Sequence, residues 1–262
     1  MAWLTAQDYF NPDEFNSKVL GIASELAQHD SGKHCHDMGQ LLLTQGGVIR
    51  IIMNQSLCIL PPGRAAWIPP LCMHRAKIIS VVGYRSVYLD TNSYPNLPRG
   101  AKIIGATPLL RAAMERIAVA DFSTNWESGP YANILAVFLD EILAARSEHT
   151  LLPLPNDRRL QHLAGLSWIP QLKELAPKIG ASEKTISRIF RRETGLSYQQ
   201  WRQQWRLIRA LELLAEGNLL SDVANRLEFS SDSSFSTFFS NMVGCSPRTY
   251  MANDYVNDFS PL

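Results

Sequence analysis

Two histidines, His34 and His36, stand two residues apart in the stretch HCHDMGQLLL, and Gln40 follows four residues after the second. In an extended segment, side chains two residues apart point to the same side. Two imidazoles presented in this way can hold a divalent metal ion, either for catalysis or for binding alone. These residues leave both chemistries open, so the surrounding elements have to decide between them.

The chain around and after the histidines predicts a series of short strands. From about 34 to 90, apolar runs alternate with turn signals at Gly46-Gly47, Asn54-Gln55 and Pro61-Pro62-Gly63. This pattern is typical of an antiparallel barrel or sandwich. If the histidine stretch is one of these strands in the right register, both rings point into the barrel.

Beyond residue 107 the spacing of apolar residues changes to that of helices. Pro108 opens one predicted helix, and an apolar stripe on the next consists of Leu135, Phe138, Leu139 and Ile142. We expect the segment 108–150 to pack on the barrel or on a second subunit. Residues 151–159, LLPLPNDRR, contain two prolines and a polar turn, and we expect a linker crossed by few contacts.

Two similar units follow, at 172–195 and 219–244. Each has a short apolar helix, a tight turn, a serine-led second helix and a closing glycine, which is the layout of a helix-turn-helix. Ser182 is the expected N-cap of the first of these second helices. Core stripes are predicted on both second helices, formed by Ile186, Ile189 and Phe190 in the first unit and by Phe235, Phe238, Phe239 and Met242 in the second.

The opposite faces of these second helices carry side chains that suit phosphate contacts and base reading. They are Lys184, Ser187, Arg188 and Arg191 in the first unit, and Asp232, Ser233, Ser236 and Thr237 in the second. One such unit alone is equally well explained as a helical hairpin with a solvated face. Two in tandem, with matched internal spacing, favour DNA binding.

Residues 197–217 contain no glycine or proline before Gly217, which predicts one long helix between the units. A separation of about 34 Å would let the two second helices enter successive major grooves. Arg202, Arg206 and Arg209 form a stripe of their own on this helix. Residues 171–209 carry nine basic and three acidic residues, a net charge of +6, whereas residues 210–262 carry two and seven, a net charge of −5.

The stretches SRIFRRETG, RLIRALELL, DVANRLEFSSDSSFSTFF and VGCSPRTY together resemble the DNA-binding domain of the AraC/XylS family of bacterial transcription regulators. The resemblance implies two helix-turn-helix subdomains joined by one helix, with base-facing residues Lys184, Ser187, Arg188, Asp232, Ser233, Ser236 and Thr237. Two departures stand out. Glu228 replaces the usual glycine before Phe229, which costs about 1 kcal/mol if that residue is left-handed. Pro177 lies inside a short helix, which it is expected to kink or shorten.

The stretches HCHDMGQLLL, PPGRAAWIPP and MHRAK resemble the cupin-like sensory domain of one subgroup of this family. The resemblance places His34, His36 and Gln40 in one motif and His74 in the other, so that His74 completes a three-nitrogen site. Cys72, two residues before His74, is a further candidate ligand. Enzymatic cupins usually have glutamate where Gln40 stands, and a neutral amide is a weaker ligand than a carboxylate, which argues against a catalytic iron centre.

The expected architecture is therefore α+β with two domains. A cupin-like antiparallel β-barrel covers 1–107, helices 108–150 follow, a linker covers 151–159, and an all-α DNA-binding domain covers 160–262. The chain is expected to be a sequence-specific transcription regulator, not an enzyme, whose barrel senses a small molecule or a divalent metal. Expected partners are promoter DNA, that effector, RNA polymerase and a second copy of the chain.

Three alternatives remain open at this point. One is a metal-dependent cupin enzyme, either a dioxygenase or an isomerase, with a helical appendage. Another is an inherited barrel without metal, whose histidines are hydrogen-bonded or contact an organic effector. In the third the barrel serves only for dimerisation. Four scattered cysteines, a first segment without the order of a signal peptide, and the lack of a long uncharged apolar run favour the cytoplasm over secretion or a membrane.

Overall fold

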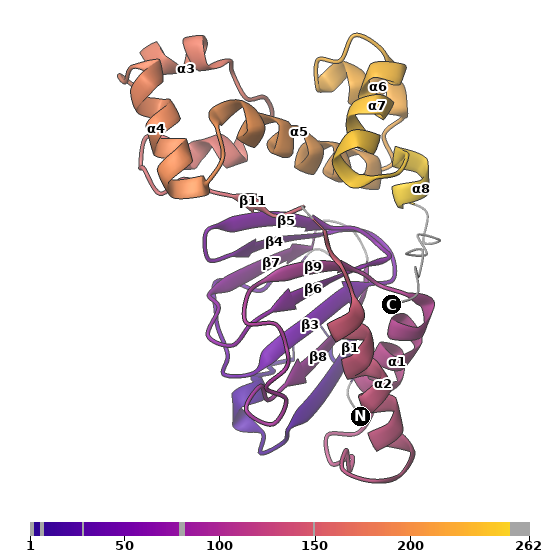
Figure 1. Cartoon of the computed structure of the whole chain (residues 1–262). Coiled ribbons are helices and arrows are strands. Elements are labelled where there is room, and N and C mark those ends of the chain that lie inside the picture. Colours follow the sequence, from indigo (N-terminus) through magenta and orange to yellow (C-terminus); the bar gives the residue numbers. More distant parts are fainter. Residues whose placement is uncertain (1–2, 6–7, 28, 79–81, 149, 252–262) are drawn as a thin grey trace.

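Two antiparallel sheets form the N-terminal domain of the computed structural model, which describes residues 3–5, 8–27, 29–78, 82–148 and 150–251 (Figure 1). One sheet has the strand order β1-β8-β3-β6-β9-β10 and the other β11-β5-β4-β7-β2. The expected barrel is thus a pair of unclosed sheets. The strands are β1 Val19–Leu26, β2 His29–Asp30, β3 Gly39–Thr44, β4 Ile49–Met53, β5 Ser56–Leu60, β6 Arg64–Ile68, β7 His74–Ile78, β8 Val82–Leu89, β9 Lys102–Gly105, β10 Ser147–Glu148 and β11 Leu152–Pro153.

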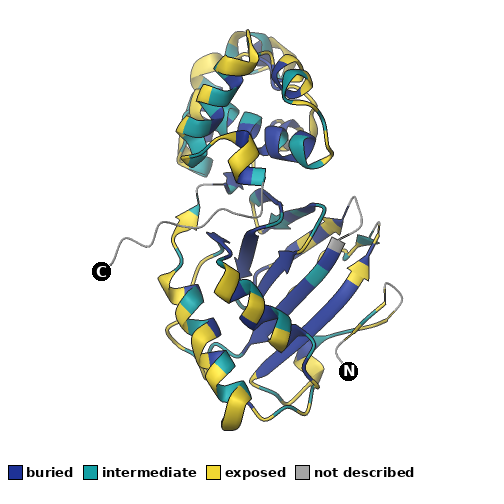
Figure 2. Cartoon of the chain, turned by 90° about the vertical axis from the view of Figure 1, so that its right-hand side faces the viewer, coloured by how far each residue is buried: buried dark blue, intermediate teal, exposed yellow. Residues whose placement is uncertain are grey.

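One apolar core of this domain lies between the sheets, and most strand residues are coloured as buried in Figure 2. Alternation along single strands explains it, because successive side chains point to opposite faces. On β4, Ile49, Ile51 and Met53 are buried, whereas Arg50 and Ile52 are half-buried. The inward residues of β4 join a cluster with Ala76 and Ile78 of β7 and with Leu42 of β3. The two sheets therefore share one interior.

Helices α1 (Pro108–Ala118) and α2 (Gly129–Ala144) cover the outer face of the first sheet. The Thr107 hydroxyl caps α1 by accepting from the amide of Leu110. Gly21 of β1 lets α1 approach closely, because a Cβ at this position would meet the Ile117 carbonyl oxygen at 2.0 Å. The predicted stripe of α2 is confirmed as its inner face, with Leu135, Phe138 and Ile142 buried and Leu139 packed beside them. Its other face is exposed (Figure 2).

The C-terminal domain contains the two predicted helix-turn-helix units at opposite ends of α5 (Figure 1). The Ser182 hydroxyl caps α4 as predicted, and the left-handed glycines Gly195 and Gly244 close α4 and α7. Helices α3 and α6 are both seven residues long, so Pro177 does not shorten α3. The helices are α3 Leu172–Lys178, α4 Glu183–Thr194, α5 Tyr198–Ala215, α6 Leu220–Arg226, α7 Asp232–Val243 and α8 Pro247–Met251, preceded by a 3-10 turn at Gln161–Gly165; another 3-10 turn, Pro12–Glu14, precedes β1.

Glu228, at the position where the resemblance led us to expect glycine, has a left-handed backbone with φ of 58°. Its neighbours stabilise the turn between α6 and α7. The Arg206 guanidinium donates to the carbonyl oxygen of Leu227 and lies over the ring of Phe229, 4.0 Å from its centroid. Arg202 lies 3.6 Å from the Glu228 carboxylate. These contacts offset part of the cost of a side chain at a left-handed position.

The three arginines of the α5 stripe are half-buried, and each contacts a group of the protein itself. Arg202 donates from Nε to the carbonyl of Ile169, and Arg209 pairs with Glu212 at 2.7 Å. Arg206 is also in contact with the protein, through the Leu227 carbonyl. All three arginines were counted in the net charge of +6 of residues 171–209. The basic residues left exposed in that half lie on α3 and α4.

The expectation that few contacts cross residues 151–159 is wrong. Leu152 and Pro153 form β11, which pairs with β5, and Leu152 is fully buried in a cluster shared with the C-terminal domain. The Trp201 indole of α5 donates to the Pro153 carbonyl at 2.6 Å. Prolines and polar residues in this segment reflect an edge strand and a turn, which the same residue types also favour.

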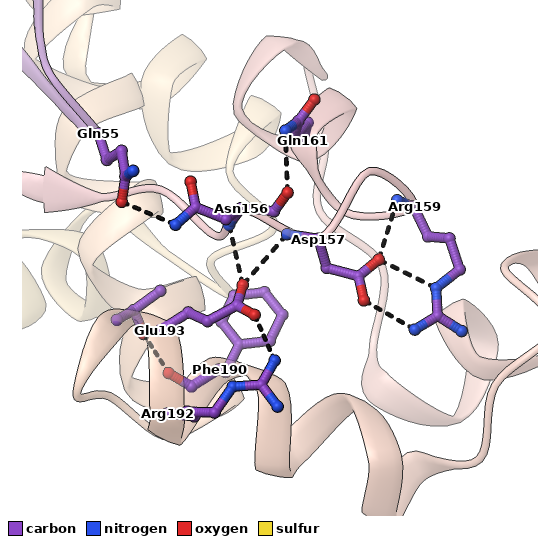
Figure 3. A network of polar contacts seen from close by, with 9 residues as sticks. Gln55, Asn156, Asp157, Arg159, Gln161, Phe190, Arg192 and Glu193 are labelled. Carbon is purple, nitrogen blue, oxygen red and sulfur yellow. Dashed lines mark hydrogen bonds and ion pairs between the residues drawn. The ribbon is translucent and has the colours of Figure 1, made fainter.

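The polar half of this segment forms the network in Figure 3. The backbone amides of Asn156 and Asp157 both donate to Oε2 of Glu193, at 2.9 and 3.1 Å. The Asn156 side chain donates to Oε1 of Gln55, in the turn between β4 and β5, at 2.9 Å. Glu193 lies in the last turn of α4. The segment thus connects a turn of the N-terminal domain to a helix of the C-terminal domain.

A third contact between the domains is ionic. Arg50 of β4 pairs with Glu212 of α5, which is only 5% exposed. Arg64 of β6 is fully buried, pairs with Glu148 at 2.8 Å and lies 3.8 Å from the ring centroid of Tyr250 on α8.

Among the helices of the described residues, none is both long and apolar enough to cross a membrane.

Candidate functional site

The structure brings three of the predicted ligands together at one end of the space between the sheets. His34, His36 and His74 each contribute a ring nitrogen, and these nitrogens all lie within 4.8 Å of one another. His34 and His74 are paired by two backbone hydrogen bonds of 3.0 and 2.8 Å. His34 lies in this single bridge and His36 outside any strand, so the predicted regular strand is wrong although both rings reach the site.

Backbone carbonyls fix which nitrogen of each of the three rings carries the proton in its neutral form. Nδ1 of His34, His36 and His74 lies 3.2, 2.5 and 2.9 Å from the carbonyl oxygens of Gly32, Met38 and Cys72, respectively. A carbonyl oxygen only accepts, so each Nδ1 carries a proton, and in the neutral form of each ring the lone pair is on Nε2. This arrangement is the one that metal-binding histidines adopt, with the outer nitrogen donating to a fixed acceptor.

Burial keeps two of these rings neutral. It lowers the pKa of His36, and it lowers the pKa of His74 to about 4. The hydrogen bonds from Nδ1 to the Met38 and Cys72 carbonyls oppose that effect without outweighing it. Near pH 7 both imidazoles therefore present a free lone pair, which is the state that a metal ion requires.

Gln40 of β3 adds an oxygen to the cluster. Its Oε1 lies 3.2 Å from Nε2 of His36, and its Nε2 lies 3.1, 2.8 and 3.0 Å from the hydroxyls of Tyr84, Ser86 and Tyr88. Because Nδ1 of His36 holds the proton, its Nε2 and the amide oxygen are two acceptors facing each other. A cation between them resolves this contact, as does the opposite orientation of the amide.

Cys72 does not join the cluster through its sulfur. Its side chain packs in the core formed by both sheets, only 5% exposed, and is absent from the walls of the cavity described below. Burial raises the pKa of the thiol, which disfavours the thiolate that would bind a metal. The residue contributes its carbonyl instead, as the acceptor for His74. The prediction of a cysteine ligand fails because the chain turns at Leu71, whose φ is 58°.

A cavity of about 500 Å³ opens beside the histidines. Its walls combine apolar side chains with the hydroxyls of Tyr84 and Tyr88, and residues 4, 5 and 8–13 line part of it. Sequence reasoning missed His29 and the polar side chains of β8. Their signal is present in YRSVY, because Tyr84, Ser86 and Tyr88 alternate along a strand and so share one face.

The predicted DNA-facing residues lie on the outer faces of α4 and α7. Six of them are exposed, and Ser187 and Ser236 are half-buried. The predicted core residues Ile186, Ile189 and Phe190 of α4 are buried. On α7, Phe235 and Phe239 are buried, and Phe238 and Met242 pack partly against the same core. The exposed set is Lys184, Arg188, Arg191, Asp232, Ser233 and Thr237.

Family models match both halves of the chain. Residues 16–168, more than half of it, match the AraC-like ligand binding domain, and residues 175–253 match a helix-turn-helix domain. The chain belongs to the AraC family of transcription regulators. It is a DNA-binding regulator with an N-terminal ligand-binding domain and a C-terminal helix-turn-helix domain.

Known proteins resemble this AraC-family chain either over most of its length or over a part of it. The HTH-type transcriptional regulator NimR of Escherichia coli K12 is 27% identical over 252 residues, which are 93% of this chain and 91% of NimR. RipA of Corynebacterium glutamicum, another HTH-type regulator, is 33% identical over 103 residues, 37% of this chain and 31% of RipA. The crystal structure of ToxT from Vibrio cholerae aligns with a TM-score of 0.37 at 9% identity, covering 90% of this chain and 99% of ToxT.

Proposed function

We propose that this AraC-family regulator responds to a divalent transition-metal ion held by His34, His36 and His74, with Gln40 as a weaker fourth ligand. The observation that carries this proposal is the shared orientation of the three imidazoles. Each has its Nδ1 proton engaged by a carbonyl, and the ligand nitrogens converge within 4.8 Å. Three imidazole nitrogens and an amide oxygen suit Zn²⁺, Co²⁺ or Ni²⁺ better than Mg²⁺ or Ca²⁺.

Titration with Co²⁺ tests this proposal, because its visible absorption reports coordination. Wild-type protein, purified under reducing conditions without chelator, is expected to bind one equivalent. His36→Ala and His74→Ala are expected to lose more than about 100-fold in affinity, the upper end of what loss of a ligand's outer partner costs. His162→Ala, an exposed histidine of the C-terminal domain, is the control and binds as the wild type. Equal binding by all four proteins contradicts the proposal.

A small organic effector is a second candidate for the same cavity. A volume of about 500 Å³ is far more than one ion needs and lies in the range of small-molecule sites. Described residues of its wall include Asp8, Asp13 and Asp30 but no lysine or arginine. A neutral or cationic molecule therefore suits the cavity better than an anion unless a metal ion is bound first. Thermal-shift screening with and without Co²⁺ separates these cases.

The eight predicted residues of α4 and α7 are proposed to contact promoter DNA, with α4 supplying most of the affinity. The exposed Lys184, Arg188 and Arg191 on α4 support this assignment, because basic side chains dominate binding to the phosphate backbone. We also propose regulation without catalysis. The support is that NimR and RipA are transcription regulators and that Gln40, an amide, stands where enzymatic cupins usually carry a carboxylate.

Two protein partners belong to the same proposal. The exposed face of α2, with Val137 38% and Leu143 44% exposed, is proposed to pack against a second copy of the chain. The net charge of −5 in residues 210–262 supports RNA polymerase as a further partner of the second helix-turn-helix unit, beside the DNA contacts proposed for α7, because an acidic surface suits a protein partner better than DNA.

A further inference from the structure

The turn between β4 and β5 lies between the histidine site and the helix expected to read DNA. Asn54 in this turn has a left-handed backbone, with φ of 48°. Its amide donates to the Met73 carbonyl at 2.6 Å, and its side-chain oxygen accepts from the Met73 amide at 3.1 Å. Met73 directly precedes His74. The turn is thus hydrogen-bonded to the backbone that positions a ring of the site.

The next residue of the same turn contacts the segment between the domains. Gln55 accepts from the Asn156 side chain at 2.9 Å, and its carbonyl accepts from the Leu154 amide at 2.6 Å. Figure 3 shows Gln55 and Asn156 pointing toward each other, with Glu193 below them. The amides of Asn156 and Asp157 then converge on one carboxylate oxygen of Glu193. A continuous chain of hydrogen bonds therefore joins Met73 to the last turn of α4.

The Glu193 end of this chain is held firmly. Its side chain is 13% exposed, and Arg192 donates to Oε1 at 2.5 Å while the two backbone amides occupy Oε2. The Arg192 guanidinium, together with the amides of Asp157 and Asn156, holds the pKa of this carboxyl below its ordinary value. A charged acceptor makes these bonds stronger than those between neutral groups. The 156–157 backbone is therefore hydrogen-bonded directly to a charged side chain of α4.

We propose that Gln55, Asn156 and Glu193 are positioning residues that set the pose of α4 on DNA, and that they transmit occupancy of the histidine site to α4. The second half of this proposal rests on the proposed function of that site. A metal ion bound at His74 is expected to shift the backbone at 72–74. The Asn54–Gln55 turn is expected to move with it, because Asn54 is hydrogen-bonded to Met73. The hydrogen bond between Gln55 and Asn156 is the step at which the signal leaves the N-terminal domain.

Variants can interrupt this step, because this hydrogen bond runs between the Gln55 and Asn156 side chains, whereas the backbone bond from the Leu154 amide to the Gln55 carbonyl is kept in all of them. Asn156→Ala and Gln55→Ala remove the bond and leave the backbone amides that bind Glu193. Gln55→Glu keeps an acceptor for Asn156. Arg159→Ala is the matched control, since Arg159 lies in the same segment and binds Asp157 at 2.7 and 2.9 Å without entering the chain of bonds.

The first measurement needs no metal. Affinities of the full-length proteins for the operator and for a scrambled duplex are compared at one salt concentration. Asn156→Ala and Gln55→Ala are expected to lower the ratio of the two affinities about three- to tenfold. Gln55→Glu and Arg159→Ala are expected to stay within about twofold of the wild type. Equal ratios for Asn156→Ala and Arg159→Ala overturn the positioning role, and thermal unfolding shows whether a variant has merely lost its fold.

The second measurement repeats the titration with saturating Co²⁺. Wild-type affinity for the operator is expected to change at least about fivefold, the lower limit of typical coupling. Asn156→Ala is expected to bind Co²⁺ as tightly as the wild type and to show less than about a twofold change. A wild-type response in Asn156→Ala overturns the transmission. If the wild type binds no Co²⁺, the proposed metal function and metal-linked transmission both fail, while the first measurement still decides the positioning role.

Discussion

Gln40 is the residue whose type sets how tightly the histidine site can hold a cation. Its amide oxygen already lies 3.2 Å from His36, and three hydroxyls surround its other end. Hydroxyls can donate as well as accept, so the same surroundings can stabilise a carboxylate. We expect Gln40→Glu to strengthen Co²⁺ binding about tenfold, because a carboxylate is the better ligand. Competition titration against a chelator measures it, and weaker binding than the wild type contradicts the assigned ligand set.

At the same scale, the two helix-turn-helix units differ in the charge that they present to DNA. Arg188→Ala on α4 is expected to cost about 1–3 kcal/mol of operator binding and to relax specificity at one base pair. Ser233→Ala on α7 is expected to cost clearly less, because a hydroxyl supplies no counterion release. Both are measured by titration on the native operator at one fixed salt concentration. A larger loss from Ser233→Ala would reverse the assigned order of the units.

Among the elements, the turn between α6 and α7 stores a small backbone strain at Glu228. A left-handed residue with a side chain costs about 1–2 kcal/mol relative to glycine. The ion pair with Arg202 offsets only a small part of this cost, because the Glu228 side chain is 54% exposed and the pair is screened by solvent. Glu228→Gly is therefore expected to raise the free energy of unfolding by about 0.5–1 kcal/mol. Urea unfolding measures it, with Glu228→Gln, which removes only the ion pair, as the control.

The helical elements could be predicted almost completely because their signals are local. Ser182 and Gly195 sit at the ends of α4 in the sequence as in the structure, and the apolar spacing between them identifies the buried face. Long-range pairing leaves no such local signal. Nothing near Leu152 in the sequence indicates β5 as its partner, and nothing near Arg206 indicates the Leu227 carbonyl. The histidine site was predicted in part. The sequence identified His34 and His36 as candidate ligands, but it did not show that the Cys72 side chain packs in the core.

At the scale of the whole molecule, the two domains share part of their core. Leu152 is fully buried together with Val48, Leu57 and Ile59 of the N-terminal domain and with residues of α3–α8. A fragment 155–262 is expected to fold and bind DNA, but with lower stability than a fragment 150–262, which keeps Leu152 and the Pro153 carbonyl that Trp201 uses. Loss of one buried leucine typically costs about 2–5 kcal/mol. Circular dichroism during urea unfolding compares them, and equal midpoints would show that β11 belongs energetically to the N-terminal domain alone.

The pairing of β11 with β5 also bears on how such regulators can be recombined in the laboratory. One way to recombine two regulators is to join the ligand-binding domain of one to the DNA-binding domain of the other at the connecting peptide. Here that peptide pairs as an edge strand with the N-terminal domain and packs against the C-terminal domain. A junction inside 151–157 would therefore expose an unpaired sheet edge and remove contacts that the C-terminal domain makes with this segment. A chimera that keeps these contacts has to take residues 151–157 and the β4–β5 hairpin from the same parent protein. The hairpin together with the peptide, and not the peptide alone, is then the segment to exchange.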